Sequence, residues 1–252
     1  MIRLPRRLQH GQGAELVDHL DEFRLRLIVS LVAVAAAFGV AYANHQRLVR
    51  WLEAPLPGDR KLVTYGVAEP FLTSLQVSFA AGIALALPIV LWQLWSFLAP
   101  AVEPNAQRAV MWCVVSATAL FAGGIAFGYG IALPAALNFL TNYDSSIYDI
   151  QIRAREYISF SVAVLVAVGV VFEMPAVIVT LARLGIVKSQ TLRTHRRIGY
   201  GITAVIAVAL PGVDPVTTVL EMIPLFILFE ASIWLSVIAE RRRRIALAAS
   251  TT

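Results

Sequence analysis

Residues 71–92 decide the fold class of this chain, and they read FLTSLQVSFAAGIALALPIVLW. No charged residue occurs in this stretch. A helix needs about 20 predominantly apolar residues to cross the roughly 30 Å hydrocarbon core of a bilayer. The stretch is long enough and apolar enough to meet that requirement, so it predicts a transmembrane helix.

The rest of the chain is apolar in the same way. Hydrophobic residues make up 58% of the 252 residues and charged residues 15%, whereas a soluble domain averages about 45–50% and about 25%. This composition excludes a disordered chain and argues against a soluble enzyme. We predict one all-α membrane domain over residues 1–252. Its predicted parts are an amphipathic N-terminus (1–24), six transmembrane helices (25–43, 71–92, 109–133, 157–182, 198–210 and 216–239) and a basic tail (240–252).

The fifth predicted span, 198–210, is the shortest. At about 1.5 Å per residue it covers roughly 20 Å, less than the hydrocarbon core, and Pro211 and Gly212 then stop the helix. Two interpretations stay open: a re-entrant hairpin with the sixth span, or a full crossing where the bilayer is thinned.

Basic residues predict the orientation. With the N-terminus inside, 15 of the 21 Lys and Arg residues fall in inner segments and six in outer segments. Because cytoplasmic loops are enriched in Lys and Arg, this distribution places both termini in the cytoplasm. The first outer loop is the exception, since it carries Arg47, Arg50, Arg60 and Lys61.

The sequence contains no recognisable catalytic or cofactor-binding pattern. All four His residues fall outside the predicted spans, and no HExxH, GxSxG, GxGxxG or P-loop pattern occurs. The single cysteine, Cys113, excludes an intramolecular disulfide framework and a multi-cysteine metal site. We therefore expect no catalytic residues, no metal ligands and no cofactor.

Glu173 is the most informative polar residue, because it lies near the middle of the fourth predicted span. An acidic residue at that depth costs about 2.5–3.5 kcal/mol on insertion scales. Pro175 frees the carbonyl of Val171, so a kink is expected beside Glu173. Two interpretations stay open: the carboxyl is protonated or paired inside a closed bundle, or it faces a groove in which a partner helix or substrate docks.

Other polar residues mark the second and sixth spans. Glu221 and Glu230 lie inside the sixth span, and Asp214 lies in the turn before it, where it is suited to cap the helix. Glu69 opens the second span as an acidic first-turn residue followed by proline. The prolines expected to bend their spans are Pro88, Pro175 and Pro224.

Residues 15–26, before the first span, form an amphipathic stretch. Leu16, Leu20, Phe23 and Leu27 recur at helical spacing, and the polar face carries charges of both signs. Two roles stay open: a surface helix that leads into the first span, or a docking platform for a charged peptide on the cytoplasmic face.

Several short motifs follow one another along the chain. They are HLDEFR (19–24), AEPF (68–71), PIVLWQ (88–93) with Trp95, Phe97 and Pro100, FAGG (121–124) with Phe127 and residues 133–140, FEMP (172–175), and Asp214 with Pro224 and FE (229–230). Each motif is weak alone, but in this order they resemble the TatC family, the large multispanning subunit of the twin-arginine protein translocase. The resemblance extends from about His19 to Glu240.

This resemblance implies a receptor that binds the twin-arginine signal peptides of folded precursors at the cytoplasmic face of the plasma (inner) membrane. It also implies single-span partners of the TatA and TatB types, an oligomeric complex, and transport that depends on the proton-motive force. The family fold is a cupped arrangement of six helices, of which the fifth and sixth are short.

The resemblance also implies roles for individual residues. Glu22 and Arg24 lie in the signal-binding region of the family, and Glu173 would project into the concave face. Thr218 falls at a polar partner-contact site, and the further polar positions of the last hairpin are Asp214 and Glu230.

One departure from the family pattern concerns the first cytoplasmic loop. The family places a glutamate six residues after the loop proline, whereas this chain has Ala106 there, and its nearest acid is Glu103. An arginine prefers a carboxylate that can accept two hydrogen bonds, so Ala106 cannot replace the glutamate. Three possibilities stay open: Glu103 takes over with a shifted loop, Glu22 carries more of the recognition, or this copy binds signals weakly.

A second function class is a proton- or cation-coupled secondary transporter. In that interpretation Glu173 and Glu230 would bind the coupling ion at a broken helix. The six predicted spans contain no evident internal repeat, which argues against it.

Overall fold

The computed structural model describes residues 16–57, 61–98, 106–147, 150–184, 187, 189–211 and 214–249. This part of the chain is nearly all helical and has no β-strand, only an isolated bridge between Val63 and Arg153. The elements are α1 (Leu16–Ala43), α2 (His45–Glu53), α3 (Glu69–Leu98), α4 (Ala106–Phe127), the π-helical segment η2 (Gly128–Ala132), α5 (Leu133–Asn142), α6 (Ala154–Phe172), α7 (Met174–Leu184), α8 (Ser189–Thr194), α9 (Arg196–Ala209) and α10 (Pro215–Ala249). The predicted all-α class is confirmed.

Five helical segments are long and apolar enough to cross a membrane. They are Leu20–Ala43, Glu69–Phe97, Met111–Asn142, Ala154–Ala182 and Pro215–Ile238. Only 6% of the most apolar window is buried inside the protein in the first segment, and no more than 39% in any of them. Apolar side chains that the protein does not cover need another apolar environment, so these helices face lipid.

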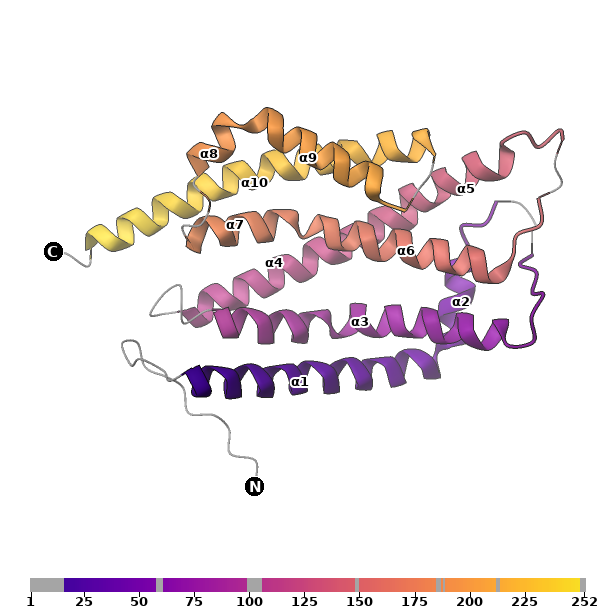
Figure 1. The fold of residues 1–252 in the computed structure, drawn as a ribbon, viewed down its shortest axis with the longest axis horizontal. Coiled ribbons are helices and arrows are strands. Elements are labelled where there is room, and N and C mark those ends of the chain that lie inside the picture. Colours follow the sequence, from indigo (N-terminus) through magenta and orange to yellow (C-terminus); the bar gives the residue numbers. More distant parts are fainter. Residues whose placement is uncertain are drawn as a thin grey trace, which may run out of the picture.

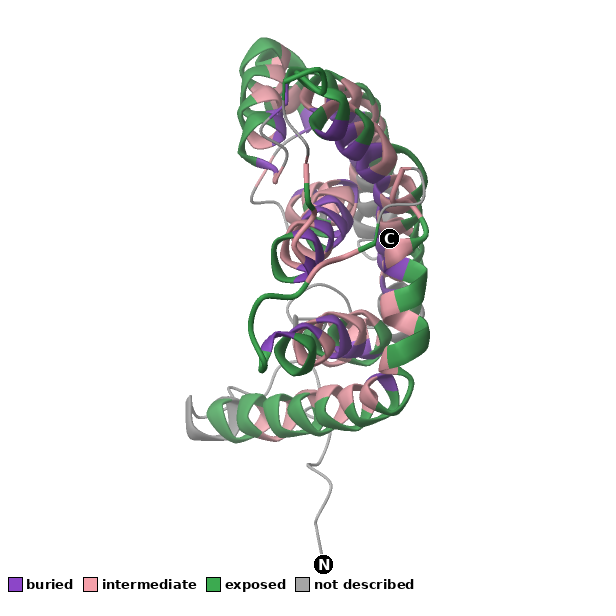
Figure 2. Cartoon of the chain, turned by 90° about the vertical axis from the view of Figure 1, so that its right-hand side faces the viewer, coloured by how far each residue is buried: buried purple, intermediate pink, exposed green. Residues whose placement is uncertain are grey.

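The helices form a curved layer rather than a closed bundle. α1 packs along α3, α3 contacts α4 and α6, and α7 packs along α10, which also carries α9 (Figure 1). In the rotated view the layer is tall, thin and bent, with buried residues where helices meet and exposed residues along its outer sides (Figure 2). This is the cupped arrangement that the family resemblance implies.

The third span is assembled from three consecutive pieces, α4, η2 and α5. Pro134 lies in the first turn of α5 and has no N–H to donate to the preceding turn. The N–H of Leu133 reaches the carbonyl of Gly128, five residues earlier, which is the π-helical pattern. The chain thus absorbs the proline without leaving the helix.

The fourth span is interrupted at Glu173, where α6 ends and α7 begins. The N–H of Glu173 donates to the carbonyl of Val170 at 3.1 Å, three residues back, which tightens the last turn of α6. The interruption lies beside Pro175, where the sequence predicts a kink. Pro88 and Pro224, by contrast, lie inside α3 and α10, which continue as single helices past them.

The end of the chain differs from the expected pattern. α9 has 14 residues and is short, as expected, but α10 has 35 and is not the short sixth helix of the resemblance. Beyond the apolar stretch, residues 240–249 contain Arg, Leu and Ala, which favour helix, so α10 continues into the basic tail. Likewise α1 begins at Leu16, so the amphipathic stretch and the first span form one helix.

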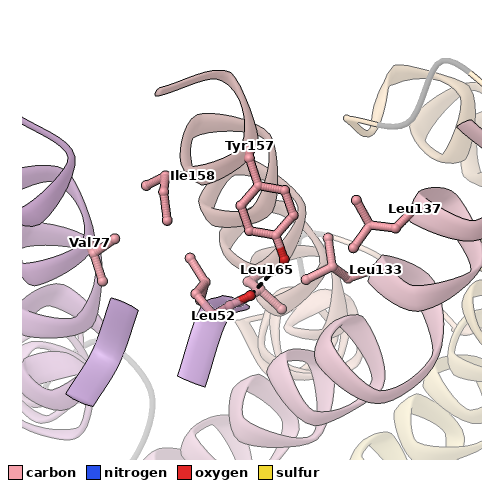
Figure 3. Packing of buried hydrophobic residues seen from close by; sticks show 7 residues of the cluster. All are labelled: Leu52, Val77, Leu133, Leu137, Tyr157, Ile158 and Leu165. Carbon is pink, nitrogen blue, oxygen red and sulfur yellow. Dashed lines mark hydrogen bonds between the residues drawn. The ribbon is translucent and has the colours of Figure 1, made fainter. Parts of the chain in front are cut away.

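The packed core lies between α2, α3, α5 and α6. Seven buried side chains meet there: Leu52, Val77, Leu133, Leu137, Tyr157, Ile158 and Leu165 (Figure 3). The hydroxyl of Tyr157 donates to the carbonyl of Leu52 at 2.7 Å, so α2 is fixed against α6. A second apolar cluster joins α6, α9 and α10.

Candidate functional site

The first candidate site lies where α1 begins and α3 ends, at the left of Figure 1. We call this side of the layer the entry end. Phe23 of α1 and Phe97 of α3 hold the two helices together here, with ring centroids 5.7 Å apart. Glu22, the carboxylate predicted to bind signal peptides, is therefore on a helix that α3 supports.

Glu22 is already paired within the protein. Arg26, one helical turn along, donates to the carboxylate from Nε at 2.9 Å and from Nη2 at 2.6 Å. A third contact, from Arg26 Nη1 to Gln93 Oε1 at 3.4 Å, extends to α3. The sequence analysis did not assign a role to Arg26, although its spacing of four residues from Glu22 is the signal for such a pair.

The pair leaves part of the carboxylate accessible. Both hydrogen bonds from Arg26 end on Oε1 of Glu22, and Oε2 has no partner among the described residues. The two side chains are 18% and 24% exposed, for Glu22 and Arg26 respectively. Arg24 is exposed and forms no ion pair within the described part of the chain. The site can therefore accept one further donor from outside.

Glu103, the second predicted signal-binding acid, lies outside the described residues. Ala106 is the first residue of α4, and its side chain is not among those described. The distance between Glu22 and Glu103 therefore stays open, and their joint action stays a prediction.

Glu173 lies at the joint between α6 and α7 and is half-buried. Its Oε1 atom is buried without a hydrogen-bond partner in the described structure. Around it the α4–α6 contact is tight, because a Cβ on Gly124 would lie 2.8 Å from the Cα of Gly169. The carboxyl is thus neither sealed in a closed bundle nor paired with another side chain.

Asp214 caps α10, as its place in the turn predicts. Its Oδ1 accepts hydrogen bonds from the N–H of Thr217 at 2.7 Å and from the Thr217 hydroxyl at 2.8 Å. The side chain is buried, so Asp214 is not available to a partner at the surface. Thr218 is half-buried, and its hydroxyl donates to the carbonyl of Asp214 at 2.9 Å.

Glu230 is held by α9. Its Oε1 accepts a hydrogen bond from the Tyr200 hydroxyl at 2.5 Å, and its Oε2 lies 3.6 Å from Nη2 of Arg196. Glu230 therefore fastens α10 to α9 rather than standing free. Glu221, two to three turns before it, is buried on the same helix.

Glu69 organises the opposite end of the layer, where α3 begins. Its carboxylate accepts hydrogen bonds from Arg153 Nε at 3.0 Å and from the N–H groups of Tyr65, Gly66 and Arg155 at 3.1–3.2 Å. The hydrogen bond and charge of Glu69 raise the pKa of the Arg153 guanidinium. The sequence identifies Glu69 as a helix-opening acid but does not reveal that it joins the two outer loops.

Comparison with known proteins identifies the family. The family model for the Sec-independent protein translocase protein (TatC) matches residues 18–224. This chain belongs to the TatC family. It is 37% identical over 232 residues to the Sec-independent protein translocase protein TatC of Deinococcus radiodurans, covering 89% of this chain and 86% of that protein. TatCd of Bacillus subtilis is 34% identical, with 90% and 93% covered, and TatC of Escherichia coli is 33% identical, with 88% and 87% covered.

The fold is that of a solved TatC structure. A crystal structure described as the twin arginine translocase receptor TatC superposes with a TM-score of 0.75 at 33% identity, covering 88% of this chain and 99% of that one. A second crystal structure of that receptor, in the detergent DDM, gives a TM-score of 0.76. The present chain is therefore a multi-pass Sec-independent protein translocase protein.

The predicted site residues of this TatC protein do not form one cluster. Glu22 and Arg24 lie at the entry end on α1, and Glu173 lies at the α6–α7 joint. Asp214, Thr218 and Glu230 belong to the last hairpin. Because Glu230 is engaged by Tyr200 and Arg196, the described structure offers no paired site in which Glu173 and Glu230 could hold one coupling ion.

Proposed function

We propose that this TatC protein is the receptor subunit of a twin-arginine translocase and binds the signal peptides of folded precursors at its entry end. The observation that carries the proposal is the Glu22 carboxylate, whose Oε2 lacks a partner in the described structure. A guanidinium and a carboxylate form short, directional hydrogen bonds. One signal arginine would bind Oε2 of Glu22, and Glu103 would supply a second carboxylate.

The entry end would face the cytoplasm of the plasma membrane, with both termini on that side. α1 begins and α10 ends at this end of the layer, which supports an even number of crossings (Figure 1). Arg24, Arg26 and the arginines that begin α9 also favour the cytoplasm. Arg153, an exception in an outer segment, is neutralised by Glu69.

Single-span partners of the TatA and TatB types would bind along the membrane-facing parts of the layer. Glu173 and Thr218 are half-buried, so a neighbouring helix could reach either of them. A polar side chain at membrane depth favours a partner that offers it a hydrogen bond. Asp214 and Glu230 would act indirectly, by fixing the α9–α10 hairpin that carries Thr218.

The direct test is co-purification of the full-length membrane protein with a tagged twin-arginine signal, compared with its twin-lysine version. We expect capture by the arginine form alone. Combined Glu22→Ala and Glu103→Ala substitutions should abolish capture, because a cationic signal loses both carboxylates, while the protein still inserts into the membrane.

Asp21→Ala is the matched control. Asp21 is an exposed acid beside Glu22 on the same helix, so its loss removes one negative charge without touching the pair. Capture that survives the double substitution unchanged would show that the recognition patch lies elsewhere.

A further inference from the structure

The Glu22 carboxylate is occupied in a particular way. A resident guanidinium, that of Arg26, covers Oε1 and leaves Oε2 open. Gln93 on α3 accepts from the other side of the same guanidinium, so Arg26 is held from two helices. The pair is only about one-fifth exposed, which weakens screening by solvent and salt.

This arrangement separates net charge from hydrogen-bond geometry. Arg26 compensates the charge of Glu22, so an incoming cation meets a nearly neutral pair. A lysine ammonium is a strongly hydrated point charge and gains mainly from net attraction, whereas the planar guanidinium of arginine gains from directional hydrogen bonds. A compensated carboxylate with one open oxygen therefore favours arginine over lysine.

We propose that Arg26 is a specificity-determining residue of the receptor: by neutralising Glu22 and covering one of its oxygens, it makes the site reject lysine. The inference rests on the proposed function, since it concerns the same carboxylate. It differs from that proposal because Arg26 here disfavours the wrong peptide rather than binding the right one. Such discrimination requires a group that acts against the competitor as well as one that binds the ligand.

The test measures dissociation constants of twin-arginine and twin-lysine signal peptides for the full-length protein in lipid nanodiscs. In Arg26→Gln, Glu22 regains its net charge and both oxygens. We expect the twin-lysine peptide to bind about fivefold more tightly, the upper range for a partly exposed ion pair, and the twin-arginine peptide to change less than about twofold. The preference for arginine should shrink accordingly.

Two control variants isolate the cause. Arg26→Lys keeps the compensating charge and should keep most of the preference. Arg197→Gln removes an exposed positive charge at the start of α9, without an ion pair in the described structure, and should leave the preference unchanged.

The outcomes distinguish this inference from the proposed function. If Glu22→Ala abolishes twin-arginine binding but Arg26→Gln leaves the preference intact, Arg26 does not set specificity and only this inference fails. Equal loss of both peptides in Arg26→Gln also overturns it, because Arg26 would then merely support the site. If Glu22→Ala and Glu103→Ala together leave twin-arginine binding unchanged, the proposed recognition patch itself fails.

Discussion

At the scale of single residues, the acidic side chains of this protein have different tasks that their sequence positions do not reveal. Glu69 ties two loops together, Glu230 joins α10 to α9, and Asp214 caps a helix. Only Glu22 combines accessibility with an open oxygen at the entry end. Which acids are structural depends on partners far away in sequence, such as Arg153, 84 residues after Glu69.

Replacing Glu69 tests this division of roles. In Glu69→Gln the shape stays similar, but the charge that Arg153 and three backbone N–H groups share is lost. We expect the midpoint of thermal unfolding in detergent to fall by several degrees. Glu156→Gln is the control, because Glu156 is 76% exposed and lies 3.6 Å from the same arginine. Equal stability of the two variants would contradict a structural role for Glu69.

At the scale of helices, close contacts depend on a few glycines. A Cβ on Gly82 of α3 would lie 2.8 Å from the Cα of Phe38 on α1, which leaves no space for any side chain. α1 contributes little to the buried core, so its contact with α3 along this line is what holds it in the layer.

Substituting this glycine therefore has a predictable effect. We expect Gly82→Leu to destabilise the protein by about 1–3 kcal/mol or more, since the clash is with backbone rather than with a movable side chain. Gly39→Leu on α1 is the control, because nothing lies within 4 Å of its Cβ position. Unfolding in detergent measures both variants, and a tolerated Gly82→Leu would show that α1 and α3 are not closely packed there.

The sequence predicts the helices better than their joints. Hydropathy alone places five long spans and a short α9, and Pro175 explains the break at Glu173. It does not predict that α10 continues past Ala239 or that α1 includes the amphipathic stretch, because helix propensity outlasts the apolar pattern. The Arg26–Glu22 pair was recognisable from its spacing of four residues, whereas its contact with Gln93 depends on the α1–α3 packing.

At the scale of the whole molecule, the curved layer leaves most of its apolar surface to lipid and places different polar residues at its two ends (Figure 2). The opposite end is fastened by Glu69, Arg153 and the Tyr157–Leu52 hydrogen bond. The entry end retains a carboxylate that is only partly satisfied within the described structure. A rigid end opposite an accessible one suits a receptor that is approached from one side of the membrane.

The central claim is that precursors are recognised at the entry end, and photo-cross-linking tests it most directly. A photoreactive residue is placed at Leu20, which is 65% exposed on α1, or at Ile147, which is 72% exposed at the opposite end. In membranes given a twin-arginine precursor, we predict an adduct from position 20, no adduct from position 147, and none from either with a twin-lysine precursor. An adduct from position 147 alone, or equal adducts with both precursors, would contradict the account.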